Sequence, residues 1–169
     1  SPSRVHERLK ELLAQFIRVW AEEQALPLSS AGSTTLRNPE LMAALEPDSA
    51  FYLQHAPEMW GRDDFDPAND PPPDLAIEID VSSSSLGRMS IYASLGVPEV
   101  WRTDGETLTV SVLCDGQYQT SSASLALTGL SVDVVMSFLN RRTEEDEIRL
   151  IREFRTWAAA QKPSAGSDA

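Results

Sequence analysis

The sequence predicts a mixed α/β (α+β) fold, in which helices cover the faces of one β-sheet. Three observations indicate this fold class. Apolar residues recur at helical spacing near both ends of the chain, β-type runs fill most of the middle, and a short helix-like segment at 86–95 separates two groups of three such runs. The expected element order is therefore α-β-β-β-α-β-β-β-α-α, which is typical of a mixed sheet with flanking helices.

The N-terminal helix is expected from Val5 to about Ala25. Its apolar residues form one broad stripe, and Leu26-Pro27 ends the helical pattern. Packing against a core explains this stripe. From the solvent edge of the same helix, either His6 or Glu11 could reach a functional site.

The next strands are expected at 32–37 and at 49–53, where Phe51 and Tyr52 favour β-structure. Residues 38–45, which lie between them, are expected to form a loop or one helical turn. Residues 54–73 are polar and contain five prolines, so they form a long connection. Trp60 within it is expected to pin the loop to the core or to face a ligand.

The central strand lies in the stretch from Pro71 to Arg88, PPPDLAIEIDVSSSSLGR. Asp74, Glu78 and Asp80 alternate there with aliphatic residues, so the acids share one face of a strand and the aliphatics the other. Carboxylates are unfavourable in the middle of a strand, and this pattern therefore indicates a functional site. Ser82–Ser85 are then expected to cap the following helix.

The second half of the chain contains two hairpin signals and two helices. After the helix at 86–95 and Gly96, strands are expected at 99–103, 107–113 and 117–121, with Asp-Gly turns between them. Helices are expected at 131–140 and 143–161, and the second of these is either docked on the domain or a homodimer contact. We expect residues 1–162 to form a single domain and residues 163–169 to form a disordered tail.

Composition narrows the class of protein. The 169 residues carry a net charge of −12, one cysteine and two histidines. These numbers argue against broad electrostatic nucleic-acid binding, an internal disulfide and a structural zinc site. A single cysteine fits a reducing cytoplasm, and no apolar run approaches the roughly 20 residues that cross a bilayer. We therefore expect a cytoplasmic protein with no membrane partner, in which any metal is a hard ion held by carboxylates.

Spacing decides which acids can act together. Residues two apart on a strand are about 6.6 Å apart in Cα position, so Glu78 and Asp80 could reach one ion, whereas Asp74 is explained by capping the strand start. A further carboxylate is expected from Asp48, because strands consecutive in sequence are often neighbours. Such an oxygen cage suits Mg²⁺, with Arg88 pointing back at the strand end. The alternative is an acidic, solvent-facing strand with Arg88 as its surface counter-ion.

Four segments carry a family resemblance: Glu46-Pro47-Asp48, Phe51-Tyr52, PPPDLAIEID and IYASLGVPEVWR. In this order and spacing they resemble the bacterial restriction-endonuclease-like family of the PD-(D/E)XK nuclease superfamily, over roughly residues 32–118. The resemblance implies a mixed sheet of four or five strands flanked by helices, with additional C-terminal helices familiar from one branch of the family.

Carried over residue by residue, the resemblance makes Asp48 the acid of the Pro-Asp motif and Glu78 the acid of the E-x-K motif. It implies that both bind a divalent metal, Mg²⁺ or Mn²⁺, with the backbone carbonyl of Ile79 as a further ligand. Asp80 stands at the lysine position of E-x-K. In this family a lysine one helical turn before a tyrosine takes that role, and here this position holds Arg88.

This departure bears on catalysis. Arginine stays charged and is a planar fork, so Arg88 could stabilise a phosphate but could hardly help to deprotonate water. The leading hypothesis is a Mg²⁺-dependent endonuclease that hydrolyses phosphodiester bonds in DNA, with Asp48, Glu78 and Arg88 as catalytic residues. The alternative is a nuclease fold retained as a binding or interaction module without catalysis. A third hypothesis is a homodimeric scaffold built on the last helix.

Overall fold

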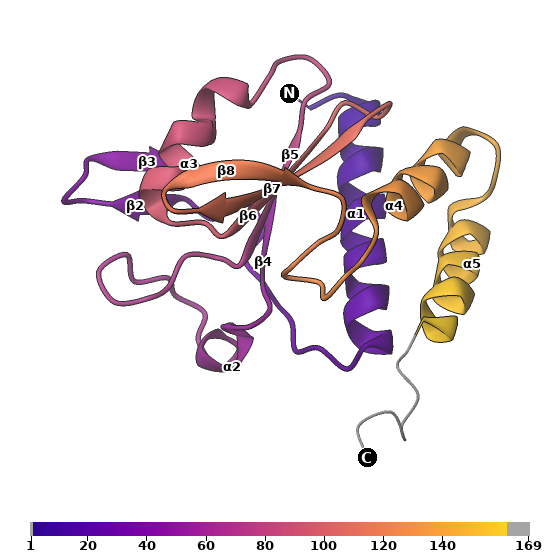
Figure 1. Ribbon diagram of the computed structural model, residues 1–169, viewed down its shortest axis with the longest axis horizontal. Coiled ribbons are helices and arrows are strands. Elements are labelled where there is room, and N and C mark those ends of the chain that lie inside the picture. The colour runs from indigo at the N-terminus through magenta and orange to yellow at the C-terminus, as the bar shows by residue number, and fades with distance from the viewer. Residues whose placement is uncertain (1, 162–169) are drawn as a thin grey trace.

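A six-stranded mixed sheet forms the centre of the protein, whose structure, a computed structural model, describes residues 2–161 (Figure 1). The strand order is β1-β4-β5-β6-β7-β8. β5 and β6 are parallel and every other neighbouring pair is antiparallel. The strands are β1 (Ser29–Ser30), β4 (Ser49–Tyr52), β5 (Leu75–Ile79), β6 (Glu99–Thr103), β7 (Leu108–Cys114) and β8 (Gln117–Ser121).

Helices cover both faces of this sheet. On one side lie α1 (Arg4–Glu23), α4 (Val132–Leu139) and α5 (Glu147–Ala160); on the other lie the 3-10 helix η1 (Leu86–Arg88), α3 (Met89–Leu95) and a separate hairpin of β2 (Leu36–Asn38) and β3 (Ala43–Leu45) (Figure 1). The short α2 (Ala56–Met59) lies in the long connection, and the 3-10 helix η2 (Asn140–Thr143) follows α4. The predicted α+β class with a mixed sheet and flanking helices is confirmed. None of the helices within residues 2–161 is long and apolar enough to span a bilayer.

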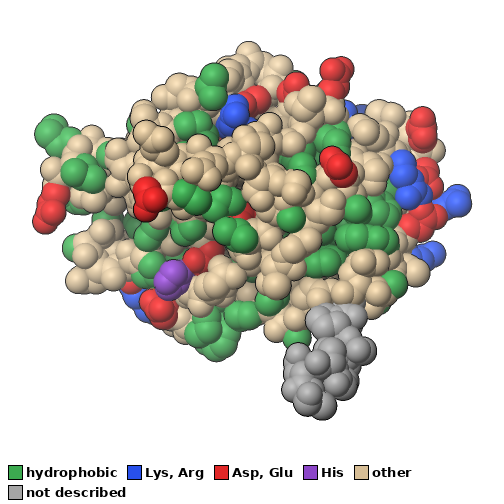
Figure 2. Space-filling model, viewed as in Figure 1, with side chains coloured by type: hydrophobic (Ala, Val, Ile, Leu, Met, Phe, Trp, Pro, Cys, Tyr) green, Lys and Arg blue, Asp and Glu red, His purple; other side chains and the backbone are tan. Residues whose placement is uncertain are grey.

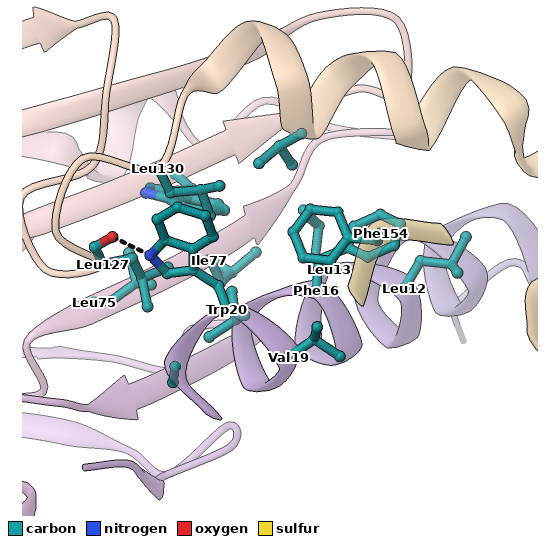
Figure 3. Close-up of a cluster of buried hydrophobic side chains, with 14 of the residues drawn as sticks. Leu12, Leu13, Phe16, Val19, Trp20, Leu75, Ile77, Leu127, Leu130 and Phe154 are labelled. Atoms are coloured by element: carbon teal, nitrogen blue, oxygen red, sulfur yellow. Dashed lines mark hydrogen bonds between the residues drawn. The ribbon is translucent and has the colours of Figure 1, made fainter. Parts of the chain in front are cut away.

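The larger core lies between the sheet and α1, α4 and α5 (Figure 3). The apolar stripe of α1 packs Phe16 against Phe154 of α5, with ring centroids 4.6 Å apart. Trp20 stacks on Trp157 at 5.5 Å, and its indole N–H donates to the carbonyl of Leu127. The last helix is therefore docked on its own domain through its apolar face.

The smaller core lies on the opposite face of β5 and β6, beneath α3 and the β2–β3 hairpin. Ala76 and Val100 of the sheet contact Tyr92 of α3 and the buried leucines of the hairpin. All five residues of β5 are buried, because each face of the strand lies against one of the two cores. The alternative of an acidic, solvent-facing strand is therefore wrong: Glu78 is 1% exposed.

Two local predictions differ from the structure. Residues 38–45, expected as a loop or helical turn, form the last residue of β2, the turn and the second strand of the β2–β3 hairpin. Its strand Ala43–Leu45 is short and contains two alanines, which have weak β-propensity. Trp60 does not pin the long connection to the core, because it is 64% exposed. The expected tail at 163–169 lies outside the described residues.

The serine run also differs from its expected role. The hydroxyl of Ser84 accepts from the backbone N–H of Leu86 at 3.1 Å, whereas Ser85, which precedes the 3-10 helix, makes no side-chain cap. The Ser85 hydroxyl instead donates to Asp80 at 2.9 Å. One serine thus caps the helix, and the next connects the loop to the end of the central strand.

Candidate active site

The antiparallel pairing of β4 with β5 brings together two acids that are 30 residues apart in sequence. Ser49 pairs with Ile77, so Asp48, just before β4, lies beside Glu78 near the end of β5. The N-terminal turn of α1 closes the same region from the other side. Together they surround a pocket of about 590 Å³, whose lining includes His6, Asp48, Glu78, Ile79, Asp80, Ser82–Ser85 and Arg88.

Glu78 is the buried acid of this pocket. The phenol of Tyr92 donates to its Oε1 and the guanidinium of Arg88 donates to its Oε2. Burial raises the pKa of Glu78 from 4.5 to about 7, although Tyr92 and Arg88 both act to lower it. The charge of Asp48 adds to the rise. Glu78 therefore lies near the midpoint of its titration at neutral pH.

Asp48 is the more exposed acid and is held by two contacts. Its Oδ2 accepts from the backbone N–H of Ile79 at 2.7 Å, and its Oδ1 lies 3.1 Å from Nε2 of His6. The first contact links the start of β4 to the end of β5, next to Glu78. The expectation that Asp48 would come from a neighbouring strand to join Glu78 is thus confirmed.

His6 is a pocket residue absent from the predicted set of site residues. It lies in the first turn of α1, where the hydroxyl of Ser3 caps the helix by accepting from the His6 backbone N–H at 3.2 Å. The sequence left His6 and Glu11 open as residues that could reach a site, and only His6 lines this pocket. The choice between them depends on the crossing of α1 over the sheet, which helical periodicity does not reveal.

Asp80 lines the pocket just beyond the end of β5, and its contacts lie mainly with the serine loop. Its carboxylate accepts from the backbone N–H of Ser85 at 3.1 Å and from the Ser85 hydroxyl, and one oxygen lies 3.8 Å from Arg102. Within residues 2–161, no three His, Cys, Asp or Glu side chains converge closely enough to hold a metal ion. A ligand role for Asp80 stays a prediction.

Asp74 lies near the opposite end of β5 and has a structural role, as predicted. It is 2% exposed, and its Oδ2 accepts from the backbone N–H groups of Leu53 and His55 at 2.7 and 2.9 Å. Its Oδ1 lies 2.6 Å from Nδ1 of His55. Asp74 thereby ties the start of β5 to the chain that leaves β4.

A protein-family model matches the sequence. The family model named Uma2, described as "Putative restriction endonuclease", matches residues 1–140. The chain belongs to the Uma2 family. The matched range runs from α1 to the end of α4 and includes every residue that lines the pocket. No curated protein matches the chain. Membership of Uma2 confirms the predicted restriction-endonuclease-like family and fold, and it gives the chain a nuclease-like function.

Restriction-endonuclease-like families generally use divalent metals, and the donor set of this Uma2 pocket fits such an ion. Asp48, Glu78 and the Ile79 carbonyl offer only oxygen, and Mg²⁺ is usually bound through one or two carboxylates plus waters and phosphate oxygens. A carboxylate has about four lone-pair positions. The hydrogen bonds from Tyr92 and Arg88 therefore leave Glu78 with lone pairs that could bind an ion.

Proposed function

We propose that this chain is a Mg²⁺- or Mn²⁺-dependent endonuclease that hydrolyses phosphodiester bonds in DNA. The observation that supports it is the pair of Asp48 and Glu78, which lie side by side in one pocket with Arg88 on the buried acid. Asp48, Glu78 and the carbonyl of Ile79 would hold the ion, and Asp80 is a further candidate ligand. A bound divalent ion would polarise the phosphate and lower the pKa of a bound water.

The residues around the two acids keep them in place. Tyr92 acts as a hydrogen-bond donor to Glu78, because burial and the neighbouring carboxylate raise its pKa and keep the phenol protonated. Arg88 is permanently charged, and 41% of its side chain is exposed toward the pocket mouth. It can hold a substrate phosphate and stabilise negative charge that develops there.

The net charge of −12 limits how DNA can be bound. Basic side chains gather at the end of the molecule that holds α5, but acidic ones lie between them (Figure 2). Arg141, for example, pairs with Glu145 and Glu153. The paired charges of η2 and α5 offer little attraction for phosphates, so we infer that DNA is engaged locally, at the pocket mouth.

Cleavage of plasmid DNA with Mg²⁺ or Mn²⁺ tests the proposal. Wild-type protein should cleave, and Glu78→Ala should abolish cleavage because it removes the buried acid. Glu11→Ala is the matched control, since Glu11 is an exposed acid of α1 away from the pocket. Glu11→Ala should cleave like wild type, and cleavage that survives Glu78→Ala would reject the assignment.

One observation favours a second candidate, a nuclease-fold binding module without catalysis. Arg88 occupies the position where the resemblance places a lysine, and it pairs directly with Glu78. The variant Arg88→Lys separates the candidates. If wild type binds DNA without cutting and Arg88→Lys gains cleavage of at least about tenfold, the arginine is the cause of the inactivity. Equal cleavage by both proteins would show that Arg88 supports catalysis.

A further inference from the structure

A second polar pocket, of about 370 Å³, adjoins the candidate active site. The two pockets share three lining residues, Asp80, Ser83 and Ser84, so the serine loop forms the wall between them. The other lining residues of the second pocket come from the ends of β6 and β7 and their hairpin: Arg102, Thr103, Asp104, Thr107 and Thr109, with Val81 from the loop. We call it the Arg102 pocket.

Strand register places Arg102 beside the buried acid of the active site. Arg102 pairs with Glu78 across the parallel strands β5 and β6, and it pairs with Thr109 across β6 and β7. Directly paired residues project from the same face of a sheet. Glu78, Arg102 and Thr109 therefore form a row across three strands, and the Arg102 pocket extends the active site sideways along this row.

The guanidinium of Arg102 has few partners. Within residues 2–161, its one ion pair joins Nη1 to an Asp80 oxygen at the long distance of 3.8 Å, and its Nε is buried without a hydrogen bond. Guanidinium offers five N–H donors. A buried polar atom without a partner calls for an explanation, and a ligand that turns the guanidinium toward itself would provide one.

The carboxylates of the pocket do not supply that partner. Asp80 is held by two hydrogen bonds from Ser85. The Oδ1 of Asp104 accepts from the backbone N–H groups of Glu106 and Thr107, both at 2.8 Å, which lowers the pKa of Asp104 and keeps it turned into its own hairpin. The hydroxyls of Ser83 and Thr109, which line the pocket together with Arg102, make no hydrogen bond within residues 2–161 and are available as donors.

We propose that the Arg102 pocket is a phosphate subsite, which holds a neighbouring phosphodiester of the same nucleic-acid strand whose scissile phosphate lies at Asp48 and Glu78. This inference rests on the proposed function. Arginine and hydroxyl side chains are the usual contacts to backbone phosphates, and the arginine fork suits two phosphate oxygens. The subsite acts on a tethered strand rather than on free phosphate, because Asp80 and Asp104 oppose the entry of a free anion.

The salt dependence of DNA binding tests this subsite. A fluorescein-labelled DNA duplex is titrated by anisotropy at several salt concentrations with Ca²⁺ in place of Mg²⁺, for wild type, Arg102→Gln, Arg102→Lys and Arg155→Gln. Arg155 is the matched control. It lies on α5, where it pairs with Glu22 of α1, and it lines neither pocket. Loss of one phosphate contact should reduce the slope of log K against log salt by about 0.9.

The expected result is a reduced slope for Arg102→Gln, and a wild-type slope for Arg102→Lys and Arg155→Gln. A wild-type slope for Arg102→Gln would overturn the subsite while leaving the proposed function intact. Wild-type protein that does not bind the duplex at all would overturn both. Inorganic phosphate that competes with the duplex for wild type, but not for Arg102→Gln, would indicate a free-anion site and overturn the strand assignment.

A second variant covers the case in which Arg102→Gln does not fold, as checked by circular dichroism and thermal melting. Thr109→Val keeps the side-chain shape and removes only the hydroxyl. It should weaken duplex binding by about fivefold at constant salt slope, because a neutral hydrogen bond is lost and no charge. Unchanged duplex binding by a folded Thr109→Val variant would reject the pocket as a phosphate subsite.

Discussion

At the residue scale, Glu78 faces two opposite requirements. Its 1% exposure disfavours the charged form, whereas the arginine, the tyrosine and any bound cation favour it. The net effect places its pKa at about 7. If Glu78 holds the proposed metal ion, metal binding and proton binding at this side chain compete near neutral pH, and both can be measured.

The first prediction concerns the pH dependence of Mn²⁺ binding. A carboxylate must be ionised to bind a metal, so below pH 7 protons increasingly occupy Glu78. Mn²⁺ affinity should rise by roughly fivefold from pH 6 to pH 7 and level off above pH 8. Isothermal titration calorimetry across this range measures it, with Glu78→Gln as the variant that should lose tight binding. An affinity that is constant from pH 6 to pH 8 would contradict the raised pKa.

The second prediction concerns stability. The pKa of Glu78 is raised from 4.5 to about 7 on folding, so its contribution to stability is fully present below pH 4.5 and is lost as pH rises through 7. Glu78→Gln stays neutral at every pH. It should therefore gain stability relative to wild type between pH 5 and pH 8, by up to roughly 3 kcal/mol. Urea unfolding of wild type and Glu78→Gln at pH 5 and pH 8 measures this change. The same difference in unfolding free energy at both pH values would count against the prediction.

At the element scale, buried side chains join strand ends and hold the site together. Asp48 links the start of β4 to the end of β5, and Asp74 links the start of β5 to the end of β4. The antiparallel pair is thus closed at both ends by an aspartate that accepts a backbone N–H. The Asp48 link lines the candidate active site, and the Asp74 link lies at the opposite end of the strand pair.

The third prediction tests the distal link. Asp74→Ala leaves the buried N–H of Leu53 and that of His55 without their acceptor, which should cost about 2–5 kcal/mol of unfolding free energy. The hydrogen bond to Asp74 also raises the pKa of His55, so this variant should lower that pKa toward 6.5. Urea unfolding and an NMR titration of His55 measure the two effects. Asp63→Ala, an exposed acid of the same connection, should change stability by less than about 0.5 kcal/mol.

The contact between His55 and Asp74 also contributes to stability, and this contribution depends on pH. The folded-state pKa of His55 is raised, so its contribution is fully present below pH 6.5 and is lost as pH rises through the raised value. The stability difference between wild type and Asp74→Ala should therefore be larger at pH 6 than at pH 9. A difference that grows with pH would show that the histidine does not stabilise the fold through Asp74.

The sequence predicted those parts of the fold and site that depend on local pattern. Strands β6 and β8 begin and end where their β-type runs and Asp-Gly turns indicated. The sequence also predicted that Asp48 lies beside Glu78, because strands that follow each other in sequence are often neighbours in a sheet. The β2–β3 hairpin was missed because its second strand has weak β-propensity. The sequence left open whether His6 or Glu11 reaches the site, because the crossing of α1 over the sheet decides between them. Arg102 was not predicted, because strand register alone brings it beside Glu78.

At the scale of the whole molecule, α1 connects the candidate active site to the C-terminal helices. Its first turn carries His6 against Asp48, and its later turns carry Phe16 and Trp20 against the aromatic rings of α5 (Figure 3). The docking of α5 therefore supports the helix that forms one wall of the site. The same packing determines how the chain should respond when α5 is removed.

The last prediction separates a docked helix from a dimer contact. Truncation after Thr143 removes α5, whose Leu150, Phe154 and Ala158 are buried within the domain, and uncovers Phe16 of α1. The truncated chain should lose cooperative folding or self-associate, because a large apolar surface becomes exposed. Light scattering should then give a mass per particle that rises with concentration. A truncated chain that stays folded at half the particle mass of the full chain would instead identify α5 as a homodimer contact.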